Sequence, residues 1–430
     1  MWARLARIRE LTERVKDLGG GSEYKGRMTM KTHNRRNSVL ALFGLLALSV
    51  YILACTSFSP DDSKVLYPSF DPVSGVIGLA AYDREARASQ ILFLPVTYDT
   101  KESNTVPVSS ILRAGWLANG REIVVACTSG KDSSDTGGLS LSLIPWGASY
   151  PFKVFRVPEL NEAAQFFMVP LCVASDCVFL STSRTGIARL NLRTGALTGH
   201  EFDDAKGEVA LYPTPDGNGV FYLETGVQPD QRIEFGRLGP KDFSRKPLMV
   251  WTNDFGSGTS HINDRSVMAY DRAGKVLAFL GSGDQNDLLV LRNGQPHFAR
   301  ALDTHGQKRC FGSAILAPNG KSLYASFQQA KDTNSVSYGL MEIPLSEAPT
   351  RELILINDAP PDDESCVYYF QAAVSHDGWT AAVASTYLAC SEKPFKASDC
   401  ALFLVDLSHP AWKVTKIPIP MPVRKPSLMK

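Results

Sequence analysis

Residues 318–327 read PNGKSLYASF, a tight turn followed by an apolar run. Asn-Gly provides the positive φ that short hairpin turns need, and the run is rich in residues favoured in β-strands. The same succession recurs at Ser74-Gly75 before VIGLA, Asn119-Gly120-Arg121 before EIVVA, Asp216-Gly217-Asn218-Gly219 before VFYL, Ala273-Gly274-Lys275 before VLAF, and Asp377-Gly378 before WTAAVAS. The chain therefore repeats one turn-and-strand unit.

A second strand-like signature follows later in each unit. Three copies end in an aliphatic-Pro-apolar pattern: LFLPV at 92–96, SLIPW at 142–146 and MEIPL at 341–345. Seven such segments begin near residues 91, 139, 187, 233, 287, 339 and 401. A period of about fifty residues without amphipathic helices indicates an all-β, seven-bladed β-propeller of four-stranded antiparallel blades. We expect it to span residues 64–420, followed by a flexible tail at 421–430.

The turns carry a family resemblance. Pro318-Asn319-Gly320-Lys321 and the Asp-Gly turns resemble the WD-like repeats of TolB-type periplasmic propellers. This resemblance implies the propeller fold, but it does not identify a ligand, because one such fold hosts many functions.

The N-terminal region predicts membrane attachment. Residues 38–54 form 17 uncharged positions after Lys31, Arg35 and Arg36, the pattern of an export signal. Ile52-Leu53-Ala54-Cys55 resembles a bacterial lipobox. The resemblance implies that 28–54 is a signal peptide and Cys55 the acylated first residue of the mature chain, with 55–63 as a tether. Seventeen residues is also the lower limit for an uncleaved membrane anchor.

Two further features bear on localisation. Residues 1–27 precede a signal of ordinary length, so they are either a non-native extension from an early start codon or a cytoplasmic segment. Thr56 after Cys55 is not the Asp that retains many lipoproteins in the inner membrane, which favours the outer membrane if the cell has one. We expect a propeller outside the cytoplasm, anchored to the bilayer through Cys55 acyl groups or residues 38–54.

Charge excludes one class of partner. The chain of 430 residues has 45 basic and 44 acidic side chains and a net charge of +1. The residues before Cys55 carry a net charge of +6, which leaves −5 for the remainder. A basic nucleic-acid-binding footprint is therefore absent from the propeller.

Cysteines in an oxidising compartment are expected to pair. Cys172 and Cys177 flank a four-residue turn, Cys390 and Cys400 bracket a nine-residue loop, and Cys310 and Cys366 form a third candidate pair. Cys127 is expected to be a buried thiol. The sequence has no C-x-x-C and no His at ligand spacing from a Cys pair, so we predict no metal site.

The insertions are expected to gather on one face of the disc. Connections after the second and fourth strands of a blade share that face, and the long ones fall at 129–138, 253–264, 281–287, 303–310, 328–338, 357–365 and 389–399. We call it the long-loop face. Its candidate binding residues are Asp132, Asp135, His261, Asp264, Asp284, Asp287, His305, Asp362, Asp363 and Glu364. The alternative is that these loops are simply solvated acidic segments.

The chain shows no established catalytic motif. G-x-S-x-G, a phosphate-binding loop and H-E-x-x-H do not occur, and we assign no catalytic residue and no cofactor. The tryptophans, including Trp379, are expected to pack between blades. We predict a non-enzymatic binding or assembly module of the bacterial cell envelope, with an envelope protein or polymer as its partner. The alternative is a propeller hydrolase or lactonase with His261, Asp264 and His305 on the long-loop face.

Overall fold

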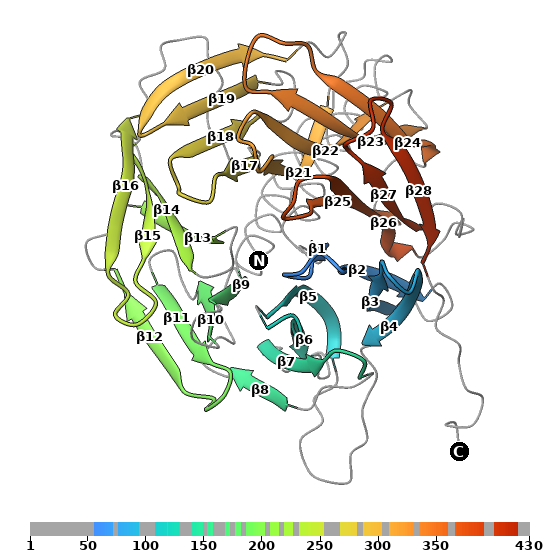
Figure 1. Ribbon diagram of the computed structural model, residues 1–430. Coiled ribbons are helices and arrows are strands. Elements are labelled where there is room, and N and C mark those ends of the chain that lie inside the picture. Colours follow the sequence, from blue (N-terminus) through green and yellow to red (C-terminus); the bar gives the residue numbers. More distant parts are fainter. Residues whose placement is uncertain are drawn as a thin grey trace, which may run out of the picture.

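The computed structural model describes residues 56–71, 76–93, 108–117, 119–129, 139–148, 153–157, 168–172, 177–181, 186–202, 207–214, 219–226, 232–252, 267–281, 287–302, 309–330, 335–359, 366–390 and 400–419. Within these ranges, 28 strands form seven four-stranded antiparallel sheets arranged in a ring (Figure 1). The predicted seven-bladed propeller is thereby confirmed.

Each blade consists of four strands that follow one another in sequence, from the central channel outward. The first three blades contain β1 (Ser57–Phe58), β2 (Lys64–Asp71), β3 (Val76–Asp83) and β4 (Ala88–Phe93); β5 (Val108–Trp116), β6 (Glu122–Ser129), β7 (Leu139–Pro145) and β8 (Lys153–Val157); and β9 (Met168–Cys172), β10 (Cys177–Ser181), β11 (Gly186–Asn191) and β12 (Leu197–Glu201).

The remaining four blades have the same order. They contain β13 (Gly207–Pro213), β14 (Val220–Gly226), β15 (Arg232–Leu238) and β16 (Arg245–Thr252); β17 (Val267–Tyr270), β18 (Val276–Leu280), β19 (Asp287–Arg292) and β20 (Gln295–Ala301); β21 (Arg309–Leu316), β22 (Ser322–Ala330), β23 (Val336–Pro344) and β24 (Arg351–Ala359); and β25 (Cys366–Val374), β26 (Thr380–Cys390), β27 (Ala401–Asp406) and β28 (Lys413–Pro418).

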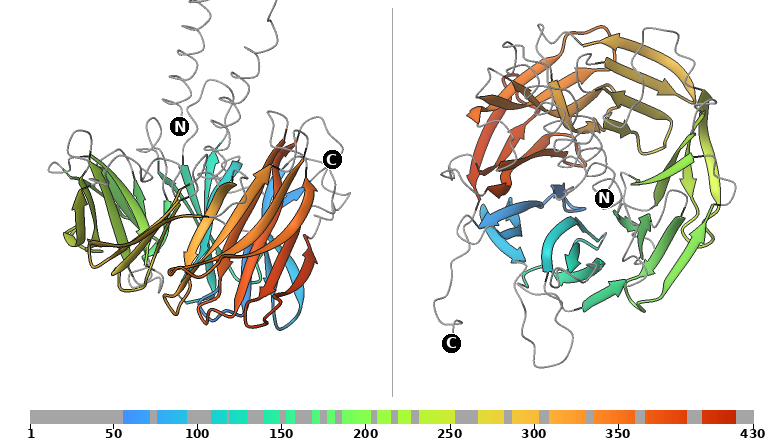
Figure 2. Two further views of the ribbon diagram at one scale, coloured as in Figure 1. Left: turned by 90° about the horizontal axis from the view of Figure 1, so that it is seen from above. Right: turned by 180° about the vertical axis from the view of Figure 1, so that it is seen from behind.

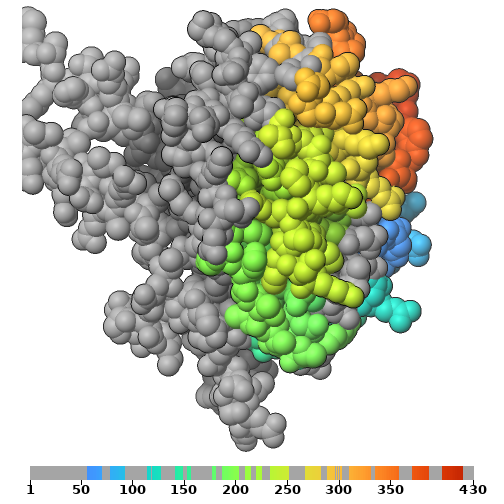
Figure 3. All heavy atoms as spheres, turned by 90° about the vertical axis from the view of Figure 1, so that its left-hand side faces the viewer, coloured from blue at the N-terminus to red at the C-terminus, as the bar shows by residue number. Residues whose placement is uncertain are grey.

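The core lies between neighbouring blades. The second strand of each blade is covered on both sheet faces, so its apolar residues run continuously instead of alternating. In β26, Ala381, Ala382, Val383 and Ala384 are all fully buried. One cluster joins Phe58 and Val65 of the first blade to these residues of the last blade. By contrast, β28 on the rim is mostly exposed. The outermost strands of successive blades form the side surface of the disc (Figure 3).

The strands run between the two faces of the disc (Figure 2). Turns between the first and second strands, which we call inner turns, share one face with the turns between the third and fourth strands. We call this the turn face. The innermost strand of every blade therefore runs from the long-loop face to the turn face.

The ring closes without an exchanged strand among the described residues. The first blade uses only the N-terminal strands β1 to β4, and the last uses only β25 to β28. Contacts of β25 with β1 and of β26 with β2 join the two blades. The structure also differs from the predicted 55–63 tether, because Ser57 and Phe58 already pair with Leu66 and Val65.

Candidate functional site at the junction of the first and last blades

The described inner turns are closed by one common backbone hydrogen bond across six residues. In six of the seven, the N–H of the first residue donates to the carbonyl of the sixth at 2.8–3.1 Å: Ser59 to Lys64, Leu117 to Glu122, Thr214 to Gly219, Asp271 to Val276, Ala317 to Ser322, and Ser375 to Thr380. The fourth residue has positive φ in five of these turns, at Asp62, Gly120, Gly274, Gly320 and Gly378. Five of the six glycine turns in the sequence pattern are such inner turns.

The first repeat predicted from the sequence lies one strand further along its blade than the other repeats do in theirs. Ser74-Gly75 lies between β2 and β3, and LFLPV starts in the fourth strand, β4, whereas SLIPW and MEIPL lie in third strands. The inner turn of the first blade is instead 59–64, Ser-Pro-Asp-Asp-Ser-Lys. It escaped detection because Asp62 occupies the position of the usual glycine. Asp and Asn are among the non-glycine residues that best tolerate this conformation.

At two junctions, neighbouring inner turns approach one another through the same positions. There the second residue of one turn lies against the fourth residue of the next: a Cβ added at Gly120 would lie 3.7 Å from Pro60 Cδ, and one at Gly378 would lie 2.9 Å from Pro318 Cδ. At the closing junction the same two positions are His376 and Asp62. The contact that involves a proline at those two junctions is therefore polar at the closing junction.

Asp62 accepts three hydrogen bonds from the last blade. Its Oδ1 accepts from the His376 backbone N–H at 3.0 Å and from His376 Nδ1 at 2.7 Å, and Oδ2 accepts from the Asp377 N–H at 3.2 Å. Burial opposes the charge of Asp62, but these hydrogen bonds outweigh it and lower the carboxyl pKa. The hydrogen bond to Asp62 raises the pKa of His376 against the effect of desolvation. The pair therefore favours a charged carboxylate and a charged imidazolium.

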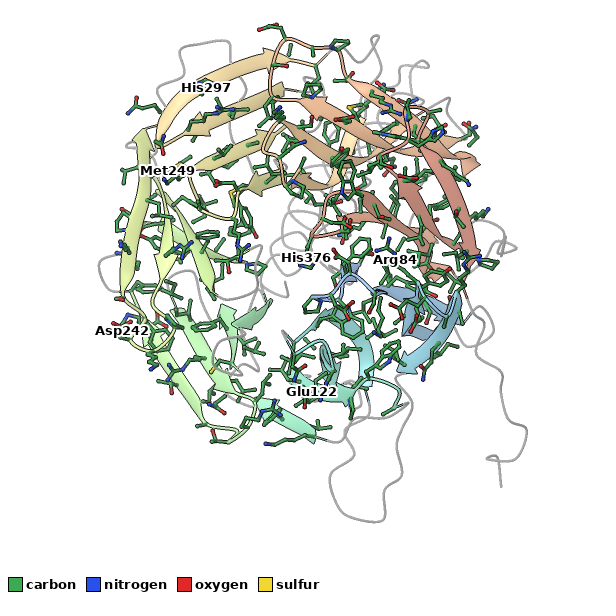
Figure 4. The ribbon with its side chains drawn as sticks, viewed as in Figure 1. Arg84, Glu122, Asp242, Met249, His297 and His376 are labelled. Atoms are coloured by element: carbon green, nitrogen blue, oxygen red, sulfur yellow. The ribbon has the colours of Figure 1, made fainter. Side chains whose placement is uncertain are left out.

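Arg84 adds a second link across this junction. Its guanidinium donates to the Asp62 carbonyl at 2.7 Å and to Thr380 Oγ1 at 3.0 Å, and it lies over the Phe58 ring. Figure 4 shows Arg84 and His376 where the first and last blades meet. The hydrogen-bonding groups of Asp62 are engaged at this junction. Asp62 therefore holds the first and last blades of the ring together.

Trp379 lies beside this junction, in the same inner turn as His376. Its side chain is 60% exposed. The prediction that Trp379 packs between blades is therefore wrong. Its backbone is fixed by hydrogen bonds to Asp377 Oδ1 and from the Leu407 N–H, both at 2.9 Å. The equivalent fifth positions of four other inner turns are polar: Ser63, Arg121, Lys275 and Lys321. A rigid turn thus presents a large aromatic side chain on the turn face.

The predicted long-loop site lies almost entirely outside the described residues. This applies to Asp132, Asp135, His261, Asp264, Asp284, His305, Asp362, Asp363 and Glu364. Asp287 is the first residue of β19, opposite Ala301 of β20. Within the described ranges, no group of three or more His, Cys, Asp and Glu side chains lies close enough together to hold a metal ion.

The strand register bears on the cysteine pairs. It sets Cys177 opposite Cys172, as predicted, and Cys366 opposite Cys390. The latter differs from the expected Cys390–Cys400 and Cys310–Cys366 pairs, because Cys310 lies opposite Gln328 and Cys400 Sγ is 3.6 Å from Thr386 Oγ1. The side chains of Cys172, Cys366 and Cys390 are outside the described part, so the disulfides stay predictions.

The predicted membrane attachment also precedes the described chain. Residues 1–54 and Cys55 lie outside it, as do residues 421–430, and Thr56 is its first residue. Among the residues that are described, none belongs to a helix long and apolar enough to cross a bilayer.

Comparison with known proteins supports no family assignment. No protein-family model matches the sequence. No curated protein matches it either. Solved structures of similar fold include a candidate 6-phosphogluconolactonase of Bacteroides fragilis, with a TM-score of 0.45, 14% identity, and coverage of 84% of this chain and 97% of that one. Another, from Bacteroides uniformis, has a TM-score of 0.46, 14% identity, and coverage of 84% and 98%.

A prolyl endopeptidase structure is similar over 90% of this chain and 54% of the endopeptidase chain, with a TM-score of 0.49 and 13% identity. These similarities concern the β-propeller fold alone, and the named proteins differ in the reactions they catalyse.

Proposed function

We propose that this protein is a membrane-anchored β-propeller of the bacterial cell envelope that binds a partner, without catalysis, through the turn face around Trp379. The observation that carries the binding site is the 60% exposure of this tryptophan at a turn position that is polar in other blades. Exposed tryptophans on rigid scaffolds are common centres of binding energy, since they bury a large area at low entropic cost.

Membrane anchorage is supported by the sequence that precedes the propeller. The uncharged run 38–54 is followed directly by Cys55, which has a lipobox-like context. The next residue, Thr56, is the first that the structure describes. Acylation would supply about 0.8 kcal/mol of membrane affinity per buried methylene.

Intact mass of the membrane-extracted protein tests the anchorage. We expect the mass of residues 55–430 plus acyl groups, and loss of the acyl mass in Cys55→Ser but not in the control Cys127→Ser. An uncleaved chain without acyl mass would indicate a single-pass anchor instead. Recovery of the wild type from the soluble fraction would contradict both forms of attachment.

Photo-cross-linking tests the binding site. A benzoylphenylalanine at Lys321, the equivalent position in the neighbouring blade, should form a defined adduct in intact cells. We expect at least a fivefold loss of this adduct in Trp379→Ser. Val414→Ser is the matched control, because Val414 is another exposed apolar residue of the last blade but lies on the rim strand β28. Equal adduct in both variants would refute the proposed site.

A further inference from the structure

The inner turns of blades five, six and seven carry two lysines and one tryptophan at the same turn position. The fifth residue is Lys275 in the first of these turns, Lys321 in the second and Trp379 in the third, and all three are exposed. In each turn the backbone carbonyl of this residue accepts a hydrogen bond, at 2.8–2.9 Å, from the residue that follows the third strand. The three side chains therefore leave the turn face from equivalent and fixed backbone positions.

The three turns follow one another around the mouth of the central channel. The turn of blade seven meets that of blade six, since a Cβ added at Gly378 would lie 2.9 Å from Pro318 Cδ. The innermost strands of blades five and six, β17 and β21, are also in contact. Lys321 is therefore in the turn next to that of Trp379, and Lys275 is one blade further along the ring.

The positive charges of these turns are available, whereas their negative charges are engaged. Among the described residues, the ammonium groups of Lys275 and Lys321 make no hydrogen bond and no ion pair. Asp271 accepts from two backbone N–H groups of its own turn, at 2.6 and 2.9 Å. Asp377 accepts from a hydroxyl and a backbone N–H of its own turn, also at 2.6 and 2.9 Å. The exposed Glu347 belongs to the outer turn between β23 and β24, further from the channel.

One tryptophan with cationic neighbours fits a protein partner better than a repeating polymer. In protein interfaces a central aromatic side chain supplies much of the binding energy, and charges around it select the partner by complementarity. A polymer of identical units would be matched by the same side chain on successive blades. The three blades instead carry Lys, Lys and Trp at this position.

We infer that the partner of the Trp379 surface presents an acidic polypeptide segment, with an apolar side chain against Trp379 and carboxylates against Lys321 and Lys275. This inference rests on the proposed binding site and adds the chemistry of the partner. Each exposed ion pair should change the affinity by only about two- to fivefold. A benzoylphenylalanine at Lys321 therefore removes one contact and still reports the adduct.

Binding of a labelled peptide to the full-length protein in zwitterionic detergent tests the inference. The probe is a fluorescent 12-residue peptide of glutamates with one central leucine. Reversal of both charges, in Lys275→Glu with Lys321→Glu, should raise the dissociation constant at least tenfold, and Trp379→Ser should raise it at least threefold. The matched control is Lys246→Glu with Lys413→Glu, which reverses two exposed lysines of the rim strands β16 and β28 and should change it less than twofold.

The other outcomes are decisive as well. Equal effects of the two double variants, or no binding of the peptide to the unmodified protein, would overturn the acidic partner. Tighter binding of an oligogalacturonate of equal charge would refute the polypeptide and assign the surface to an acidic glycan. If the cellular adduct falls in Trp379→Ser but not in Lys275→Glu, the proposed binding site stands and the acidic partner is refuted. An adduct that falls in neither variant would refute both.

Discussion

Asp62 and His376 are 314 positions apart in the sequence, yet their side chains form a 2.7 Å hydrogen bond between the first and last blades. At two other junctions, the same turn positions make an apolar contact, between Pro60 and Gly120 and between Pro318 and Gly378. No strand is shared between the terminal blades in the described residues. The polar contact therefore reinforces the junction that has no continuous chain to hold it.

Asp62 makes this contact from a backbone conformation that favours glycine. Its φ is +57°. For a residue with a side chain, the left-handed region costs roughly 1–2 kcal/mol. The three hydrogen bonds that its carboxylate accepts explain why an aspartate occupies the position despite this cost.

Substitutions at Asp62 should lower the free energy of unfolding by amounts that depend on the interactions they remove. Asp62→Ala loses the three acceptor contacts and keeps the strained φ, so we expect a loss of about 1–3 kcal/mol in the free energy of unfolding. Asp62→Gly relieves the backbone and should lose less, and Asp62→Asn, which keeps an acceptor oxygen, should lose least. Denaturant unfolding measures the order.

The matched control is Asp242→Asn in the fourth blade. Asp242 also accepts hydrogen bonds in a turn, from the N–H and hydroxyl of Ser244, but it is far from the closure. Amide hydrogen exchange should accelerate in β1 and β25 of Asp62→Ala and not in Asp242→Asn. Unchanged exchange in β1 and β25 would contradict a closing role.

The Asp62–His376 pair predicts a pH dependence of stability. The pKa of His376 is raised in the folded state, so its contribution is complete below about pH 6.5 and is lost as the pH rises through the raised pKa. The pKa of Asp62 is lowered, so its contribution is present above about pH 3.8 and is lost as the pH falls through the lowered pKa. The closure should be strongest in the mildly acidic range.

The difference in unfolding free energy between the wild type and His376→Gln isolates this effect from other titrations. Asp62 and Asp377 favour the charged imidazole, and Arg272 opposes it. We expect the difference to shrink between pH 6 and pH 9. A difference independent of pH would show that His376 acts only as a neutral donor.

The fold was predictable because its signal is local. Turns such as Asn319-Gly320 require positive φ, and each is followed by a strand that is buried on both faces. The first blade was the exception. Its turn uses Asp62 in place of glycine, and β1 has only two residues, so neither the turn pattern nor an apolar run marks where the propeller starts.

The candidate site was not predictable for a different reason. Asp62 and His376 become partners only when the ring closes, and no local pattern encodes a contact across 314 positions. The exposure of Trp379 likewise depends on its turn position, which becomes clear only when the inner turns are aligned with one another.

The strand register predicts two disulfides in an oxidising compartment, Cys172–Cys177 and Cys366–Cys390. Residues directly opposite on antiparallel strands have Cα atoms about 4.5–5.5 Å apart, within the range that a disulfide spans. Cys400 lies beside Thr386 of β26, with its Sγ 3.6 Å from Thr386 Oγ1. Cys390 lies four residues further along β26, or about 13 Å. Peptide mapping under non-reducing conditions should recover the two opposite pairs.

Variants separate the alternatives for blade seven. Cys366→Ser should leave Cys390 accessible to alkylation if Cys366 is its partner, whereas Cys400→Ser should leave Cys390 protected. The reverse pattern would establish the Cys390–Cys400 pair and would require β26 to bend away from its register.

The contact between neighbouring inner turns can be measured at Gly378. Gly320 and Gly378 occupy the same turn position with φ of +66° and +78°, but an added Cβ meets nothing within 4 Å at Gly320 and lies 2.9 Å from Pro318 Cδ at Gly378. Gly320→Ala should therefore cost only the backbone strain, about 1 kcal/mol. Gly378→Ala should cost about 2–3 kcal/mol, because overpacking adds to the strain.

In a Pro318→Ala background, the cost of Gly378→Ala should fall to that of Gly320→Ala. Additive losses in this double-mutant cycle would mean that the two turns do not press on one another.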